Sequence, residues 1–149
     1  MHSELDLKNA FQRLEVLEAE RSILRTLYAY AHCIGYGLEQ DFVDLFVDDG
    51  VFQHGKHRHL GRAELATFIA AQPRPPASHI KHLLVNPVIT LHGDEAEALS
   101  YYARVDDGPN GPFIYSFGRY RDRLVKCADH KWRFKERVTE REAIVRERR

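Results

Sequence analysis

Net charge is the first thing that this sequence lacks. Its 149 residues carry 22 Lys and Arg against 22 Asp and Glu, so the formal charge at pH 7 is zero. A chain without excess positive charge has no global field that would hold nucleic acid or an anionic membrane surface. We therefore expect a small or uncharged partner, with no nucleic acid and no membrane bound.

Cysteine and long apolar runs are also scarce. Only Cys33 and Cys127 are present and they form no C-x-x-C motif, which gives little support to a disulfide scaffold or to a thiol-redox function. No apolar run approaches the roughly 20 residues that span a bilayer. The first six residues lack the basic start and apolar stretch of a secretory signal, so we expect a cytoplasmic protein.

The composition that is present is typical of a folded globular chain. Hydrophobic residues make up 44% and aromatic residues 11% of the sequence. A chain of this length hides roughly 70% of its unfolded surface in one domain, which is enough for a core with a pocket. We predict a single domain over 1–149, with a helical extension over 1–19 and a charged tail over 140–149.

Helical spacing dominates the first half of the chain. Apolar residues recur every three or four positions over 7–34, which predicts one long helix or two in tandem. Gly35 and Gly37 then interrupt this helical pattern. Shorter helices are predicted over 40–46, where a turn at 48–50 ends the helix, and over 61–72.

The second half of the chain is typical of β-structure. Strands are predicted over 51–54, 80–91, 96–105, 113–126 and 131–139, separated by Gly, Asp, Asn and Pro turn signals. Helices followed by long antiparallel strands indicate an α+β fold.

Alternation within the strands is imperfect, so both faces of the predicted sheet carry apolar residues. We expect a curved, mixed, mostly antiparallel sheet wrapped around the N-terminal helices as a cone-shaped cavity. The convex face would then be covered by another subunit, as in a homodimer or homotrimer.

Several local strings, taken in order, resemble one known family. The strings lie at residues 30–31, 45–49, 61–65, 82–89, 100–102, 118–122 and 132–138. Over 20–138 the sequence resembles the SnoaL-like branch of the nuclear transport factor 2 (cystatin-like cone) superfamily, which includes scytalone dehydratase, polyketide cyclases and dehydrochlorinases. The resemblance supports the fold more strongly than any particular chemistry, because one fold hosts many functions.

The resemblance implies a catalytic histidine paired with an aspartate. His82 matches the histidine, which would take a proton from carbon. The matching aspartate would stand five residues after Tyr30 and eleven before Phe46, where this sequence has Gly35. His32, almost one turn before Gly35, and Asp106, at the end of a predicted strand, are the candidates to replace the missing carboxylate.

Other polar and aromatic residues are candidates for the lining of a pocket. Tyr30 would donate to a substrate oxygen, or it is a core tyrosine. Arg137 would bind a substrate carboxylate or phenolate, or form a surface salt bridge on its strand. Asn86 shares a face with His82 if the strand is regular, although Pro87 suggests a bulge. Tyr102 and Tyr115 would add aromatic walls, or simply pack.

Three histidines lie close together in one short segment. His54, His57 and His59 alternate with Lys56 and Arg58, which disfavours the converging geometry of a metal site. We interpret the segment as a solvated loop that becomes charged near pH 6, and we expect no metal.

The functional prediction is a cofactor-independent lyase or isomerase, such as a dehydratase, ketone isomerase or cyclase, acting on a small hydrophobic cyclic or aromatic substrate. His82 and Tyr30 are the predicted catalytic residues, and Arg137, Asn86, His32, Tyr102 and Tyr115 the predicted substrate-binding ones. Gly35 weakens this prediction. The alternatives are a non-catalytic binder of small molecules and a structural β-type subunit of a ring-hydroxylating dioxygenase.

Overall fold

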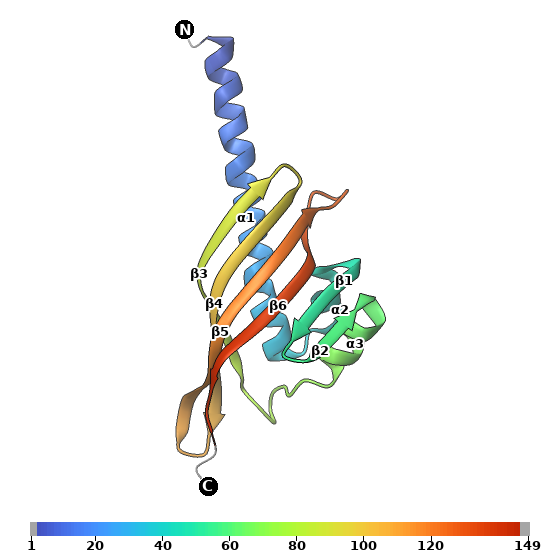
Figure 1. Cartoon of the computed structure of the whole chain (residues 1–149), viewed down its shortest axis with the longest axis vertical. Coiled ribbons are helices and arrows are strands. Elements are labelled where there is room, and N and C mark those ends of the chain that lie inside the picture. Colours follow the sequence, from blue (N-terminus) through green and yellow to red (C-terminus); the bar gives the residue numbers. More distant parts are fainter. Residues whose placement is uncertain (1–2, 147–149) are drawn as a thin grey trace.

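A long helix runs through the whole architecture. In the computed structural model, which describes residues 3–146, α1 spans Glu4–Tyr36. Ser3 and Asp6 form a capping box at its start, in which each residue bonds the backbone N–H of the other. The helix ends at Gly37, whose φ of 64° is accessible at little cost to glycine. The N-terminal half projects well beyond the rest of the molecule (Figure 1).

Two short helices and a hairpin follow. Helix α2 spans Glu39–Asp44, strands β1 and β2 span Phe46–His54 and His57–Leu60, and α3 spans Gly61–Ala70. The antiparallel β1–β2 hairpin and α3 lie together at one edge of the sheet (Figure 1).

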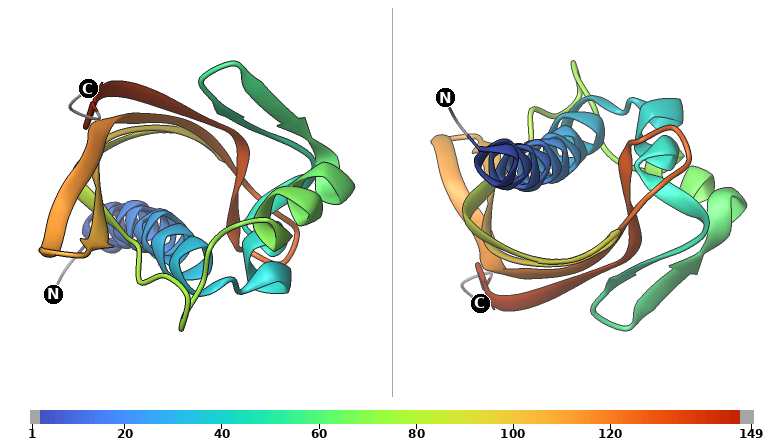
Figure 2. Two further views of the ribbon diagram at one scale, coloured as in Figure 1. Left: turned by 90° about the horizontal axis from the view of Figure 1, so that it is seen from below. Right: turned by 90° about the horizontal axis from the view of Figure 1, so that it is seen from above.

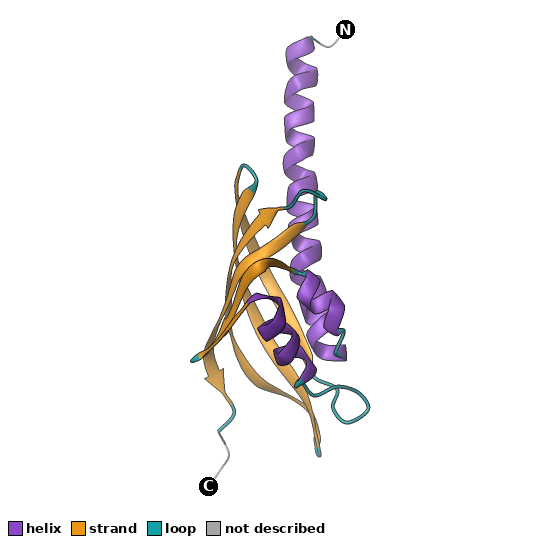
Figure 3. Cartoon of the chain, turned by 90° about the vertical axis from the view of Figure 1, so that its right-hand side faces the viewer, coloured by secondary structure: helices purple, strands orange, loops and turns teal. Residues whose placement is uncertain are grey.

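Four long strands complete the chain: β3 (Lys81–His92), β4 (Glu95–Gly108), β5 (Gly111–Lys126) and β6 (Trp132–Ile144). Within the described range the strand order is β2-β1-β6-β5-β4-β3, with β1 parallel to β6 and the other neighbouring pairs antiparallel. The sheet curves around α1, which lies along its concave side (Figures 2 and 3). The predicted α+β class, with a curved and mostly antiparallel mixed sheet around N-terminal helices, is confirmed.

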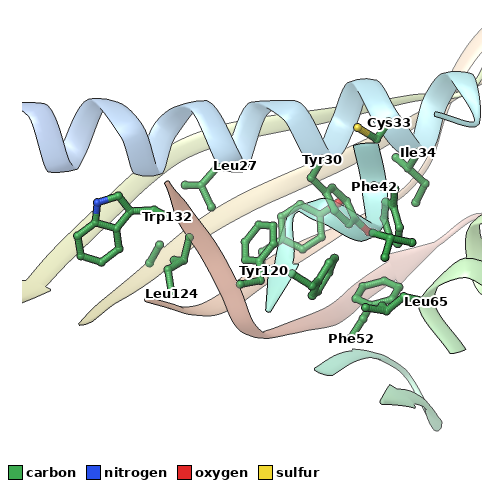
Figure 4. Packing of buried hydrophobic residues seen from close by; sticks show 14 of the residues in the cluster. Leu27, Tyr30, Cys33, Ile34, Phe42, Phe52, Leu65, Tyr120, Leu124 and Trp132 are labelled. Carbon is green, nitrogen blue, oxygen red and sulfur yellow. The ribbon is translucent and has the colours of Figure 1, made fainter. Parts of the chain in front are cut away.

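The core occupies the space between α1 and the concave face. Its helical contributions come mainly from Ile23, Leu27, Tyr30 and Ile34, spaced so that one stripe of α1 faces the sheet. Aromatic side chains from α2, β1, β5 and β6 meet this stripe (Figure 4). Cys33 is buried in the same cluster, and both cysteines are free thiols.

Several predicted boundaries differ from the structure. Residues 46–50, predicted as the end of a helix and a turn, already belong to β1, because β1 pairs with β6 from Phe46 onward. The histidine segment, predicted as a solvated loop, contains β2. Strand β6 continues through Ile144 by pairing with β5, so the first residues assigned to a charged tail are strand. Residues 147–149 lie outside the described range.

Candidate functional site

Arg137 and Asp122 form an ion pair between the sheet and α1. The two residues face each other across β5 and β6. The guanidinium donates through Nε and Nη2 to the two Asp122 carboxylate oxygens, at 2.7 and 2.8 Å, and neither side chain is exposed. The predicted salt bridge of Arg137 to an acidic neighbour on the strands is therefore present, but it is buried and not on the surface, and the substrate-binding role of Arg137 remains a prediction. Burial raises the pKa of Asp122, and the neighbouring guanidinium opposes that shift.

Aromatic rings surround the Arg137 guanidinium. Its central carbon lies 4.2 Å from the ring centroid of Tyr30, 4.0 Å from that of Tyr120 and 4.4 Å from that of Phe134. Cation–π attraction of this kind is stronger when the partners are desolvated. Burial raises the pKa of Tyr30 well above its ordinary value, so its hydroxyl stays a neutral donor. Tyr102 stacks on Tyr120 with a centroid distance of 4.7 Å.

His82 lies near the start of β3, on the face that points toward α1. Burial, followed by the positive charge of Arg104, lowers the pKa of His82 to about 4, so the imidazole is neutral at physiological pH. Arg104 is its cross-strand partner on β4 and is itself held by Asp106 through bonds of 2.7 and 2.8 Å. The Arg104 guanidinium also lies 4.3 Å from the ring centroid of Tyr115.

Asp106 was one of the two candidates to replace the aspartate that is missing at position 35. Its charge acts to raise the pKa of His82, which shows that the carboxylate lies within electrostatic reach. Both of its oxygens, however, accept hydrogen bonds from Arg104. Asp106 thus orients the arginine beside His82.

Gly35, where the resemblance implies an aspartate, lies close to the backbone that precedes β3. A Cβ at Gly35 would lie 3.1 Å from the Ile80 carbonyl oxygen, just before β3 begins. Contact that close is tighter than ordinary van der Waals packing, so α1 approaches the strand through a bare glycine. A side chain at this position requires the helix or the strand to shift.

Four buried polar atoms on inward-facing strand residues have no partner. They are His82 Nδ1, Ser100 Oγ, Arg137 Nη1 and Thr139 Oγ1. Most buried polar atoms in folded proteins are hydrogen-bonded, so each of these four exceptions has a bonding capacity that a water molecule or a ligand can complete.

The remaining predicted site residues separate into inner and outer positions. Tyr102 is buried and stacks on Tyr120, whereas Tyr115 is half-buried and lies beside the Arg104 guanidinium. Asn86 lies in a bulge of β3 with a φ of 51° and is exposed, so it does not continue the inward face of His82. His32 is exposed on α1. The predicted roles of these residues remain predictions.

The three clustered histidines are more ordered than a solvated loop. His54 and His59 point to the same side of the β1–β2 hairpin, with their Nε2 atoms 3.2 Å apart, and both rings pack near Phe68 of α3. Burial lowers the pKa of His54 and of His59, so these two rings become charged at lower pH than the sequence suggested. Over residues 3–146, no group of three or more His, Cys, Asp or Glu side chains is arranged to hold a metal.

Two surface hollows lie away from His82. One, of about 350 Å³, follows the outer side of α1 between Arg21 and His32. The other, of about 450 Å³, lies on the sheet and includes Val88, Leu99 and Arg121. Within the described part of the chain, no helix is long and apolar enough to cross a membrane.

The sequence analysis predicted roles for Arg137 and His82 but missed the side chains that lie beside them. Asp122 shares the alternating inward face of β5 with Ser116 and Tyr120, and that alternation was the available signal. The position of Arg104 beside His82 was harder to predict from the sequence, because β-bulges interrupt β3 at Asn86 and the β4–β5 pairing at Arg104 itself.

Comparison with known proteins gives a consistent picture of the fold. The model of the SnoaL-like domain matches residues 15–138. No curated protein matches the chain at a significant level. An NTF2-like protein with a cystatin-like fold from Novosphingobium aromaticivorans is 23% identical, with a TM-score of 0.82 over 93% of this chain and 89% of that one.

Two further solved structures share the fold. A protein from Novosphingobium aromaticivorans, assigned as the β subunit of an aromatic-ring-hydroxylating dioxygenase, is 24% identical, with a TM-score of 0.74 over 87% of this chain and 93% of that one. ActVI-ORFA from Streptomyces coelicolor is 16% identical, with a TM-score of 0.73 over 83% and 96% of the two chains. At these identities the likeness concerns the fold alone.

Proposed function

This chain belongs to the SnoaL-like family, and we propose that it is a cofactor-independent lyase or isomerase that moves a proton on a small hydrophobic cyclic or aromatic substrate. One observation carries the proposal: the neutral imidazole of His82 has a buried, unpartnered Nδ1 and lies beside the Arg104 cation. An unsatisfied buried nitrogen is a place where a ligand can supply the missing interaction.

The proposed step is a proton transfer from carbon to His82. The C–H bond next to a carbonyl breaks, the proton goes to the imidazole, and the electron pair moves onto the carbonyl oxygen as an enolate. Dehydration or isomerisation follows when the proton returns to a leaving hydroxyl or to another carbon. A positioned base of this kind contributes roughly a hundred- to ten-thousand-fold.

Electrostatics limit which substrates fit this step. A base whose pKa is about 4 is always available at neutral pH, but it is weak. The carbon acid must therefore be activated, for example by an adjacent aromatic ring, and the developing negative charge must be stabilised. Arg104, fixed by Asp106, supplies a positive charge beside His82, and Tyr30 is the proposed donor to the substrate oxygen.

Deuterium exchange tests this proposal without knowledge of the natural substrate. The probe is 2-tetralone, a bicyclic aromatic ketone with activated α-protons, followed by proton NMR in D₂O. We expect the wild-type protein to accelerate exchange, and His82→Gln to remove at least about a hundredfold of that acceleration. His92→Gln, which changes an exposed histidine at the far end of β3, is the matched control.

Two results would count against the enzyme. Equal exchange rates for the wild-type protein and His82→Gln would overturn the role of His82. Saturable line broadening of the ketone without exchange would favour a small-molecule binder of the same fold. A cytoplasmic location remains a prediction.

A second candidate, a structural subunit, is favoured by the convex face of the sheet. Leu83 and Val85 on β3, Leu99 and Tyr101 on β4, and Phe117 on β5 are all exposed there. A patch of this kind on neighbouring strands is typical of an interface. Native mass spectrometry separates the candidates, because co-purification with an iron-containing partner would support the subunit and a stable homo-oligomer would argue against it.

A further inference from the structure

Among residues 3–146, nothing packs against the apolar side chains of the N-terminal half of α1. It extends past the sheet (Figure 3), and its large apolar residues are exposed: Leu5, Leu7, Phe11, Leu14, Val16 and Leu17. Isolated helices of about 15 residues are marginal in water, and most helical stability in proteins comes from the packing of an apolar face. We therefore expect the projecting part of α1 to pack its apolar residues against another surface.

The apolar residues of this segment form a seam with heptad spacing. Leu7, Ala10, Leu14, Leu17 and Leu24 recur at alternating intervals of three and four, with the one longer interval interrupted by Arg21. With 3.6 residues per turn, Leu7, Ala10 and Leu14 lie on the side of α1 roughly opposite to Leu27 and Tyr30, which cover the sheet. Leu17 is also exposed, whereas Leu24 is partly buried against the core, so a second helix can approach the seam from Leu7 to Leu17 without meeting the sheet of the same chain.

We propose that the seam is covered by α1 of a second copy of this chain, in antiparallel orientation. In one alignment Leu14 faces Leu17 of the partner subunit, and Leu7 faces Leu24 of the partner subunit. The hollow of about 350 Å³ along the outer side of α1, which includes Leu24 and Tyr28, then receives the first turns of the partner helix.

Charge complementarity supports a second copy and selects the orientation. In the antiparallel alignment Arg13 faces Glu20 of the partner subunit, and Glu4 faces Arg25 of the partner subunit. Each Arg21 faces Ala10 of the partner subunit, whose small side chain leaves room for the arginine stem. In a parallel alignment the two Arg21 side chains would meet in the seam, and like charges there are unfavourable.

Sedimentation velocity on matched variants tests the interface. Leu14→Glu is expected to weaken self-association by at least about tenfold in Kd, because it places a carboxylate in the seam. Val16→Glu is the control: Val16 is 47% exposed against 50% for Leu14, but it points away from the seam. Because both sites are exposed, both variants should keep the near-ultraviolet circular dichroism of the wild-type protein.

A charge exchange tests the orientation. Arg13→Glu alone is expected to weaken the dimer, and adding Glu20→Arg to restore it, since the pair is reversed in the antiparallel alignment only. Failure of the double variant to restore the dimer would overturn the antiparallel orientation.

Three further outcomes would overturn the interface itself. One is a wild-type protein that stays monomeric at its highest soluble concentration. Another is an equal effect of Leu14→Glu and Val16→Glu. The third is a dimer that Tyr101→Glu, on the convex face, dissociates while Leu14→Glu does not.

Discussion

Arg137 donates two hydrogen bonds to Asp122 in a place where neither side chain meets solvent. Three aromatic rings surround the guanidinium, and its Nη1 has no partner. The pair thus links β5 to β6 beneath α1, while the remaining terminal nitrogen of the guanidinium, Nη1, has no hydrogen-bond partner among the described residues. Removal of one partner would leave the other charge buried and unpaired, which is far more costly than removal of both.

We expect Arg137→Met to destabilise the fold by about 3–5 kcal/mol, because it leaves the Asp122 carboxylate buried without a counter-charge. The double variant Arg137→Met/Asp122→Leu should regain much of that loss. Urea unfolding of the two variants measures the difference. A double variant no more stable than the single one would show that the pair also positions the aromatic rings.

Stability should depend on the charge of His82 in a defined pH window. The folded pKa of about 4 lies below the unfolded value of about 6.5, so the unfolded chain binds the proton first as the pH falls. The contribution of His82 is complete above pH 6.5 and is lost progressively down to about pH 4, amounting to about 3 kcal/mol. Below pH 4 the loss is complete, and the titration of His82 no longer changes the free energy of unfolding.

Urea unfolding of the wild-type protein and of His82→Gln at several pH values measures this contribution as the difference between the two curves. The comparison with a variant is needed because His54 and His59 have lowered pKa values too. A difference that does not change between pH 7 and 4 would mean that His82 is solvated and titrates normally.

Gly35→Ala should not give the usual gain of a helical Gly→Ala change. Removal of glycine from a helix interior normally stabilises by roughly 0.5–1 kcal/mol. The added Cβ would lie 3.1 Å from the Ile80 carbonyl oxygen, and this crowding offsets the gain. Thermal unfolding is the measurement, and a variant that gains about 1 kcal/mol would show that β3 moves aside freely enough to accept an aspartate.

Asn86 should tolerate glycine and reject a β-branched residue. Its φ of 51° lies in the left-handed region, where asparagine and glycine are accepted and valine is strained. We expect Asn86→Gly to be nearly neutral and Asn86→Val to cost about 1–3 kcal/mol. If Asn86→Gly abolishes exchange of the 2-tetralone probe while the fold is intact, the predicted ligand-binding role of this amide is supported.

The sequence by itself determined the order of the elements and the face that most of them bury. Helical spacing over 7–34, turn signals between the late strands and the ordered family strings depend on local periodicity and backbone preference, which act over a few residues. For the same reason the resemblance could predict His82 as the catalytic histidine and note that Gly35 stands where the aspartate was expected. The local sequence pattern predicted a helix end and a turn over residues 46–50, and this prediction was wrong. These residues belong to β1, which forms by pairing with β6, far along the chain.

Only the tertiary structure decided which side chains meet. Asp122 reaches Arg137, and Arg104 stands beside His82, through strand register, and a bulge of one residue reverses the side to which each side chain points. The burial that lowers the pKa of His82 depends on the packing of α1 against the sheet, and so does the close contact between Gly35 and the Ile80 carbonyl. Register and burial result from contacts across the whole chain, so no local pattern in the sequence contains them.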